Sequence, residues 1–388
     1  MESSQPWIAL STLACLSAIG MTLWLHRQVR MGLPVPLVAP GPHGPLISVI
    51  IPARDEARNL PRCLDALLAQ TYPHFDIVVV DDGSTDATPQ ILADYAGRAA
   101  RIRALAGQPL PSGWAGKPHA LTQGVRAARG EWLCFMDADT FGAPELLAST
   151  LAAAQTYRAL MLSLVPQQEL GTFWEKVVLP IVFTGMAVGW PAERVNDPTK
   201  PDAIAIGQFI LIHCEAYQAV GGHAALGHLI VEDQALAHAV KSAGYRLVLG
   251  DGAGLVRTRM YHSLEEIWEG FTKNIYLGLR GRLPLLLFGV LVSLLGTFTL
   301  PVWAGLALWW LAHGGGAGAV TALLEAAALW AVVLFVRARA AAGFGIPPWY
   351  AVTLPLGTFV FAGLMLGSLF KIATGRGVTW KGRRYADG

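Results

Sequence analysis

Long apolar segments at both ends of the chain limit most strongly how it can fold. Residues 7–25 are nineteen residues without a charged side chain, enough for a helix to cross the roughly 30 Å hydrocarbon core of a bilayer. Three further apolar segments lie between Leu283 and Phe370. Charged residues make up 14% of the chain, whereas an average soluble protein has about 25%. The sequence therefore predicts a membrane protein.

The arrangement of these segments stays open at two points. The segment from Leu283 to Ala312 is too long for one ordinary helix and slightly short for two, and Pro301 can mark a turn or a kink. Basic residues follow the N-terminal segment and recur in the C-terminal tail, which favours the cytosol for both and leaves the N-terminus outside. Three simple crossings would instead place the tail outside, so either the segment from Leu283 to Ala312 forms a hairpin or another segment is re-entrant.

Between its apolar ends the chain alternates apolar strands with helical patterns, which is typical of a mainly parallel α/β sheet. The segment 173–190 is apolar but contains Pro180 and Gly185, and it fits either an interfacial segment or a buried helix. The predicted domains are a transmembrane anchor at 1–26, a Pro/Gly-rich linker at 27–45, an α/β domain at 46–250, an interfacial segment at 251–283, a transmembrane region at 284–370 and a basic cytosolic tail at 371–388.

Charge and cysteine content narrow the class of protein further. The formal net charge of +2 gives no indication of a nucleic-acid partner. The four cysteines lie far apart, without the spacing of a zinc site or a disulfide framework. A reducing, cytosolic setting for the α/β domain fits this pattern.

Acidic clusters follow two of the predicted strands. Asp81 and Asp82 close the strand in IVVVDDGSTD, and Asp137 and Asp139 close the strand in EWLCFMDAD. The carboxyl ends of parallel strands form the edge of an open α/β sheet where ligands bind. Two carboxylates there suit a hard divalent cation that bridges phosphate oxygens. The pattern therefore indicates a nucleotide-sugar site.

Six short motifs together resemble those of the family 2 glycosyltransferases of GT-A fold. They are PARDEARNL, VVDDGSTD, AGKPHAL, MDAD, VGGH and VED, and they occur in the family's order and spacing between Ile47 and Asn274. The resemblance implies that the domain at 46–250 is a Rossmann-like GT-A domain. It also implies inverting transfer of a sugar from a nucleoside diphosphate sugar to an acceptor.

The resemblance assigns the nucleotide to the first two acidic pairs. Asp55 and Glu56 match the pair that lies beside the nucleotide, although Asp55 could instead cap the following helix. Asp81 and Asp82 match the pair that contacts base and ribose, and a purely structural turn is the alternative. Ser84 is then expected, together with Thr85, to cap the next helix.

The diphosphate and the metal are assigned to three further residues. Lys117 corresponds to a lysine near the nucleotide, where an ammonium suits a diphosphate, or it is a solvated surface lysine. Asp139, with Asp137, is expected to hold the metal that bridges to the two phosphates. Oxygen ligands favour Mg²⁺ or Mn²⁺ over zinc. Strand-end carboxylates that cap a turn are the alternative for both aspartates.

The catalytic base is expected at the VED motif. Asp233 matches the family's base, which must approach the attacking hydroxyl to about 3 Å. Glu232 is the competing candidate, and both acids could instead only favour the N-terminus of the following helix.

The chain departs from the family's processive polysaccharide synthases, because it has WEGFTKN at 268–274 in place of their QxxRW motif. Lys273 is a candidate replacement for the missing arginine near the diphosphate. Arg257, Arg259 and His262 are further candidates for phosphate or metal contact. A basic flank that faces lipid headgroups explains these residues equally well.

The sequence thus predicts an inverting, non-processive glycosyltransferase with multi-pass membrane attachment and a cytosolic catalytic domain. The acceptor is expected to be a lipid or lipophilic molecule, by similarity to carotenoid, hopanoid and ceramide transferases, and UDP-glucose is the donor by analogy. Two alternatives remain, a transferase for polyprenyl phosphate and a non-catalytic membrane scaffold derived from a transferase. A transporter is disfavoured because the apolar segments contain few ionisable residues such as Glu325.

Overall fold

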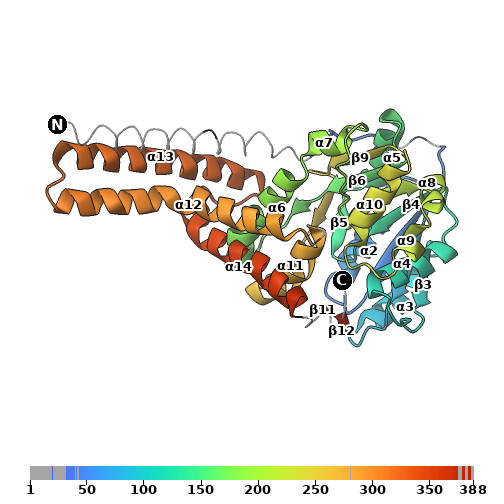
Figure 1. Cartoon of the computed structure of the whole chain (residues 1–388). Coiled ribbons are helices and arrows are strands. Elements are labelled where there is room, and N and C mark those ends of the chain that lie inside the picture. The colour runs from blue at the N-terminus through green and yellow to red at the C-terminus, as the bar shows by residue number, and fades with distance from the viewer. Residues whose placement is uncertain are drawn as a thin grey trace. The chain divides into compact units, whose positions relative to one another are not determined.

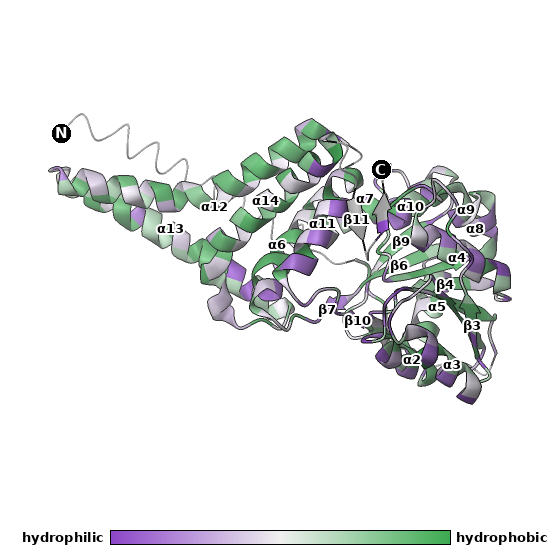
Figure 2. Ribbon diagram, turned by 90° about the horizontal axis from the view of Figure 1, so that it is seen from below, coloured by the Kyte–Doolittle hydropathy of each residue, from purple (hydrophilic) through white to green (hydrophobic). Residues whose placement is uncertain are grey.

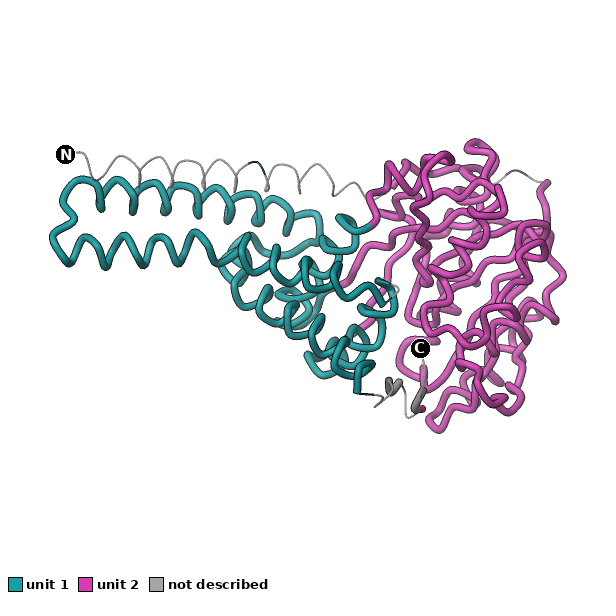
Figure 3. The backbone as a smooth tube through the Cα atoms, in the orientation of Figure 1, with its two compact units in different colours: residues 1–29, 170–189, 261–374 teal, residues 30–169, 190–260, 375–388 magenta. Residues whose placement is uncertain are grey.

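The computed structural model describes Gly20 and residues 32–39, 41, 43–279, 281–374, 378–380 and 383–385 (Figure 1). The chain forms two compact units (Figure 3). Unit 2 comprises residues 30–169, 190–260 and 375–388, and unit 1 comprises 1–29, 170–189 and 261–374. Apart from Gly20, the predicted anchor at 1–26 lies outside the described residues, so it stays a prediction.

A sheet of seven strands, counted over the described residues, forms the centre of unit 2, in the order β3-β2-β1-β4-β8-β6-β9. Neighbouring strands are parallel, except that β8 runs antiparallel to β4 and β6. The strands are β1 (Ile47–Ala53), β2 (Phe75–Asp81), β3 (Ile102–Ala106), β4 (Trp132–Met136), β6 (Met161–Val165), β8 (Phe209–His213) and β9 (Leu247–Asp251). The prediction of a mainly parallel α/β fold is therefore confirmed.

Helices cover both faces of this sheet because its strands are apolar on both sides. Val49 and Ile51 of β1 belong to the core cluster that also contains residues of α2, α3 and α5. Ile50 points to the other face, where a Cβ atom at Gly124 of α4 would lie 2.4 Å from its Cγ2 atom. Burial of each such side chain contributes about 1.5–3 kcal/mol to stability. The helices of unit 2 are α2 (Leu60–Leu68), α3 (Thr88–Arg98), α4 (Gly116–Ala127), α5 (Leu146–Thr156), α7 (Ala192–Asn196), α8 (Cys214–Ala219), α9 (Gly222–Ala225) and α10 (Glu232–Ser242).

The order of the strands brings the predicted motifs to one edge of the sheet. β1 pairs in parallel with β2 on one side and with β4 on the other, so the loops after these three strands are neighbours. The direction of strand addition reverses at this point, which is where open α/β sheets form their ligand crevice. A small second sheet, β5 (Thr140–Gly142), β10 (Val256–Thr258) and β7 (Gln167–Gln168), follows the loop after β4.

Part of the predicted linker lies against unit 2. The backbone N–H of Leu33 donates to the carbonyl of Leu249 at 2.9 Å, and the N–H of Asp251 donates to the carbonyl of Leu33 at 2.8 Å. The hydroxyl of Ser149 accepts from the backbone N–H of Val38 at 2.9 Å. This part of the linker therefore contacts unit 2 at β9 through Leu33 and at α5 through Val38.

Unit 1 is helical, and its long helices are strongly apolar (Figure 2). Over the described residues, three segments are long and apolar enough to cross a membrane, at 283–312, 316–343 and 348–373. The first is a single helix that contains Pro301, so the alternative of a turn there is not realised. The segment 173–190 likewise forms one helix despite Pro180. The elements are α6 (Phe173–Gly189), α11 (Leu264–Gly278), α12 (Leu283–Ala312), α13 (Gly316–Gly343), η1 (Pro348–Thr353) and α14 (Leu354–Ala373).

Glycines on α14 create the surface on which the shorter helix α11 packs. A Cβ atom at Gly363 or Gly367 would lie 3.2–3.3 Å from the ring of Trp268, so the absence of side chains there lets the indole approach closely. The Nζ atom of Lys371 donates to the hydroxyl of Thr272 at 2.8 Å, and the hydroxyl of Ser368 accepts from the backbone of α11 at 3.0 Å. This small-xxx-small packing is common between membrane helices.

Candidate active site

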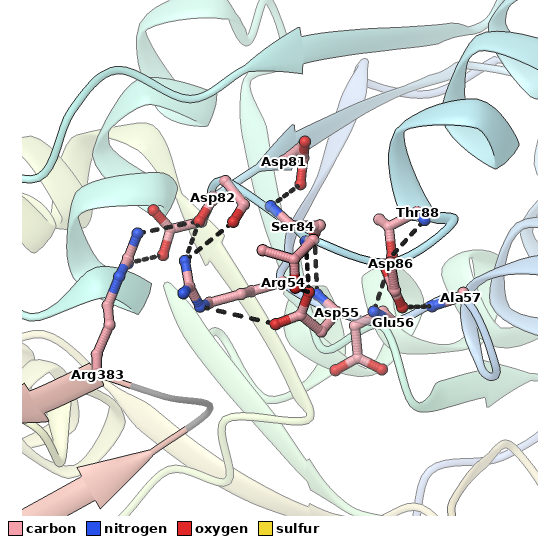
Figure 4. Close-up of polar contacts among 12 residues, drawn as sticks. Arg54, Asp55, Glu56, Ala57, Asp81, Asp82, Ser84, Asp86, Thr88 and Arg383 are labelled. Atoms are coloured by element: carbon pink, nitrogen blue, oxygen red, sulfur yellow. Dashed lines mark hydrogen bonds and ion pairs between the residues drawn. The ribbon is translucent and has the colours of Figure 1, made fainter.

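The loops after β1 and β2 are held together by their own polar groups (Figure 4). Asp55 has a φ of 51°, a left-handed conformation that aspartate tolerates better than most residues. Its carboxylate accepts from the backbone N–H of Thr85 at 2.7 Å, and its N–H donates to the hydroxyl of Ser84 at 2.9 Å. The N–H of Glu56 donates to the hydroxyl of Thr88 at 2.8 Å. The loops after β1 and β2 are therefore held together by hydrogen bonds at the edge of the sheet.

The cap expected at Ser84 and Thr85 is wrong, and the alternative of a cap at Asp55 is not realised. Asp55 does not cap α2, whose N-cap residue is Asn59 and has no side-chain capping bond. Ser84 and Thr85 do not cap α3 either, because its N-cap position is Ala87. Their hydroxyl and amide groups bond to Asp55 across the loops instead, and a sequence does not show such long-range pairing.

Asp81 and Asp82 differ in their surroundings. The Asp81 carboxylate accepts from the backbone N–H of Ser84 at 3.0 Å and thereby closes the turn of its own loop. The Asp82 side chain is 7% exposed and pairs with the guanidinium of Arg383 in the C-terminal tail. The sequence alone does not reveal this contact, because the basic residues of the tail are equally typical of a cytosolic flank that sets membrane orientation.

Lys117 connects the DxD motif with the VED motif. Its Nζ atom lies 2.7 Å from Oδ1 of Asp137 and 3.1 Å from Oε1 of Glu232. Lys117 is in the first turn of α4, and Glu232 begins α10, so two helix N-termini meet beside the loop after β4. The structure therefore brings together predicted residues that are about 20 to 115 positions apart, and Lys117 is not a solvated surface lysine.

Asp233 completes this charged group. Its Oδ2 atom accepts from the backbone N–H of Gly207 at 2.9 Å, and its Oδ1 atom accepts from its neighbour Gln234 at 2.7 Å. A Cβ atom at position 207 would lie 2.9 Å from Nζ of Lys117 and 3.0 Å from Oδ2 of Asp233. Glycine at this position therefore allows the backbone to approach both charges.

The electrostatics of the group set the proton affinity of Asp233. Loss of hydration on burial, with the nearby charge of Glu232, raises the pKa of Asp233 to about 6. Burial disfavours the charge on Lys117, but Asp137, Glu232 and Asp233 outweigh it and hold the pKa of Lys117 well above its usual value. Lys117 stays charged at neutral pH, and its charge partly offsets the rise in the pKa of Asp233. A carboxylate with a pKa near 6 is well matched to general-base work at neutral pH.

Replacing Lys117 with methionine should raise the pKa of Asp233 further, because the cation that favours its ionised form is lost. The rising limb of the pH profile of kcat/KM for the residual activity should then move above pH 6. The exposed Lys200 provides a charge-matched control, and Lys200→Met should leave the midpoint in place. An unchanged midpoint in Lys117→Met would contradict this electrostatic coupling.

Asp139 has hydrogen-bond partners of its own, and its oxygens suit a hard cation. The hydroxyls of Thr140 and Thr258 donate to its Oδ1 atom at 3.2 and 3.3 Å. Burial, together with the charges of Asp139, Glu56 and Asp137, raises the pKa of the Cys63 thiol, so these three carboxylates lie within electrostatic reach of one buried side chain. Among the described residues, no three His, Cys, Asp or Glu side chains gather closely enough to hold a metal alone. The residues fit the type of Mg²⁺ or Mn²⁺ site in which substrate phosphates complete the coordination.

The remaining candidates are basic residues on or near β10 and α11. Arg257 is on β10, and the backbone N–H of Arg259 donates to the carbonyl of Asp139 at 3.4 Å. Lys273 is on α11 in unit 1, and His262 precedes that helix. The predicted roles of Lys273 and His262 at the diphosphate or the metal therefore stay predictions.

Comparison with known proteins agrees with the motifs. Residues 48–221 match the family described as Glycosyl transferase family 2. The 4,4'-diaponeurosporenoate glycosyltransferase of Staphylococcus aureus (strain USA300) is 30% identical over 261 residues, which cover 64% of this chain and 68% of that protein. The same enzyme from strain MRSA252 shows the same identity and coverage.

A solved structure shows the same fold over nearly the whole chain. A mannosyltransferase from Pyrobaculum calidifontis, in complex with GDP-Man and Mn²⁺, has a TM-score of 0.51 and 18% identity, and the match covers 94% of this chain and 97% of that one. At this identity the likeness concerns the fold, and it supports the predicted GT-A architecture. Motifs, sheet topology and relatives agree, and the chain belongs to glycosyl transferase family 2.

Proposed function

We propose that this protein transfers a single sugar from a nucleotide-sugar donor to a lipophilic acceptor at a membrane, with inversion at the anomeric carbon. The observation that carries the proposal is the position of Asp233. Its half-buried carboxylate has a pKa near 6, and Lys117 and Glu232 connect its surroundings to Asp137 of the DxD motif. The proposed base, Asp233, and the proposed donor-binding residue Asp137 therefore belong to one group of charged side chains.

The proposed reaction is a single displacement. The acceptor oxygen forms a bond to the anomeric carbon while the bond from that carbon to the diphosphate oxygen breaks. The acceptor proton passes to the Asp233 carboxylate, and the nucleoside diphosphate leaves with the bonding electrons. One displacement with the base and the leaving group on opposite sides of the sugar gives inversion. Glu232 is less suited as the base because its carboxylate already pairs with Lys117.

The donor is proposed to bind along the loops that follow β1, β2 and β4 at the edge of the sheet. Asp55, Glu56, Asp81 and Asp82 surround the nucleoside end. Asp139 would hold a divalent cation, Mg²⁺ or Mn²⁺, which supplies charge neutralisation at the phosphates. Asp137 is held by Lys117 at 2.7 Å, so we assign it a supporting part in this site.

The acceptor class follows from the relatives and the apolar helices. The Staphylococcus aureus relatives are named for a diaponeurosporenoate acceptor, and three segments of the described chain are apolar enough to cross a membrane. We therefore propose a lipophilic acceptor of carotenoid type, with UDP-glucose as the donor by analogy. A polyprenyl phosphate is the alternative, and such an anionic acceptor needs little help from a base. Asp233 would then matter less than the metal-binding residues.

The tail supports an assignment of membrane sides. Arg383 pairs with Asp82 inside unit 2, so an even number of crossings must separate Met260 from Arg383. Helices α12 and α13 are joined by a short turn and lie side by side (Figure 1). Helix α14 packs against the shorter helices α6 and α11. We propose that α12 and α13 cross as a hairpin, that α14 does not cross, and that unit 2 and the tail face the cytosol.

This topology predicts opposite accessibility of two epitope tags in sealed membrane vesicles. A tag inserted at Gly314, between α12 and α13, should be exposed on one side, and a tag at the C-terminus on the other. Protease added to vesicles of known orientation measures which tag is cleaved. Cleavage of both tags from the same side would contradict the hairpin.

A direct test of the function is nucleoside diphosphate release by the detergent-purified full chain. The assay uses a panel of nucleotide sugars with Mn²⁺ or Mg²⁺ and either a total lipid extract or a polyprenyl phosphate. Release that depends on the lipid extract supports the proposal and identifies the donor. Release that requires polyprenyl phosphate favours the alternative acceptor. A folded protein that cleaves no donor would favour the alternative of a non-catalytic membrane scaffold.

A further inference from the structure

The C-terminal tail reaches the predicted nucleotide site. Strand β12 (Arg383–Tyr385) pairs antiparallel with β11 (Val378–Trp380), and Arg383 extends toward the loop after β2 (Figure 4). Its Nη1 atom donates to the carboxylate oxygen Oδ2 of Asp82, and its Nη2 atom donates to the main-chain carbonyl of the same residue at 3.0 Å. One guanidinium thus holds both the side chain and the backbone of Asp82.

A second guanidinium supports the same loop. The Nη1 atom of Arg54 donates to the carbonyl of Asp82 at 2.7 Å and to the carbonyl of Gly83 at 3.2 Å. The N–H of Asp82 donates to the carbonyl of Ala53 at 2.8 Å. The backbone position of Asp82 is therefore fixed by groups from β1 and from the loop that follows β1. What Arg383 adds is a partner for the carboxylate and hence a fixed side-chain orientation.

The carboxylate of Asp82 needs such a partner. Its side chain is 7% exposed, and that of Arg383 is 22% exposed. An ionised carboxylate with so little contact to water is costly unless a cation or hydrogen bonds compensate it. Asp55, Asp81 and Asp86 are in the same pair of loops, so the local field is negative. A phosphate-bearing donor would approach these loops more easily when Arg383 offsets one of the charges.

We propose that Arg383 is a positioning residue of the donor site, which holds Asp82 in the orientation that binds the nucleoside. The proposal rests on the proposed function, because it assumes that these loops bind a nucleotide. The tail is thus part of the donor site and more than a membrane-orientation signal.

The test compares Arg383→Ala with Arg384→Ala in the full chain in detergent. Both variants remove one positive charge from the same strand, but Asp82 contacts Arg383. We expect Arg383→Ala to raise KM for the donor about tenfold or more and to leave kcat within about twofold. Calorimetric titration with UDP and GDP should show matching weaker binding. Arg383→Lys should restore part of the affinity, and Arg384→Ala should resemble the wild type.

A double-mutant cycle separates positioning from general stabilisation. If Arg383 acts through Asp82, Arg383→Ala should add little to the raised KM in an Asp82→Asn background. An unchanged KM with a lower melting temperature would overturn the proposal, because the tail would then be merely structural. Tighter nucleotide binding by Arg383→Ala would also overturn it, since Arg383 would then compete with the nucleotide. A wild-type protein that binds and cleaves no nucleotide sugar would instead overturn the proposed function.

Discussion

Replacing Asp233 with asparagine should lower kcat by about 10²- to 10⁴-fold, which is the usual contribution of a general base. Asparagine keeps the shape of the side chain and can still accept from the N–H of Gly207, but it cannot take the acceptor proton. The donor KM should change little, because Asp233 belongs to the acceptor side of the proposed reaction. Steady-state kinetics with a saturating lipophilic acceptor measures both constants.

The pH dependence gives an independent check of this role. Asp233 must be ionised to accept a proton, and its pKa is about 6. In the wild type, kcat/KM should therefore rise about tenfold per pH unit below pH 6 and level off above it. This rise should disappear in Asp233→Asn. In Glu232→Gln, kcat/KM should still rise with pH. If this rise were lost in Glu232→Gln while Asp233→Asn kept full activity, Glu232 would be the base.

Replacing Asp139 with alanine should lower donor turnover by at least about 10³-fold, because the divalent cation proposed to bind there would supply several kcal/mol of charge stabilisation. The variant should also lose its response to added Mn²⁺ or Mg²⁺. Titration of the metal at a fixed donor concentration measures this response in the wild type and the variant. Asp94 is an exposed aspartate on α3, so Asp94→Ala serves as the control and should keep both activity and metal response. Full metal-dependent turnover by Asp139→Ala would show that Asp139 does not hold the metal.

The sheet and its binding edge were predictable because they depend on local patterns. Each strand of the large sheet is a short apolar run, and DDGS and MDAD stand directly after β2 and β4. Parallel alternation then places these loops at one edge without any knowledge of the strand order. The antiparallel β8 could not be foreseen, since AIGQFILIH does not indicate its direction. Pro301 also did not show whether its segment was one helix or two.

The charged groups of the site were predictable as residues but not as partners. The motifs identified Lys117, Asp137 and Glu232, yet Lys117 was expected to meet a diphosphate and it pairs with the two carboxylates. Gly207 and Arg383 were missed because their contacts are formed by folding between distant parts of the chain. Arg383 is 301 positions from Asp82, and no spacing rule connects residues at that distance.

In the proposed reaction one sugar passes to a lipophilic acceptor for each donor molecule cleaved. The experiment that tests this first quantifies, in one reaction of the purified wild-type protein, the nucleoside diphosphate released and the sugar recovered in organic-extractable product. We expect equal amounts, with one sugar on each acceptor and the anomeric configuration inverted relative to the donor. Free sugar in the aqueous phase in place of a lipophilic product, or no cleavage of any donor, would contradict it.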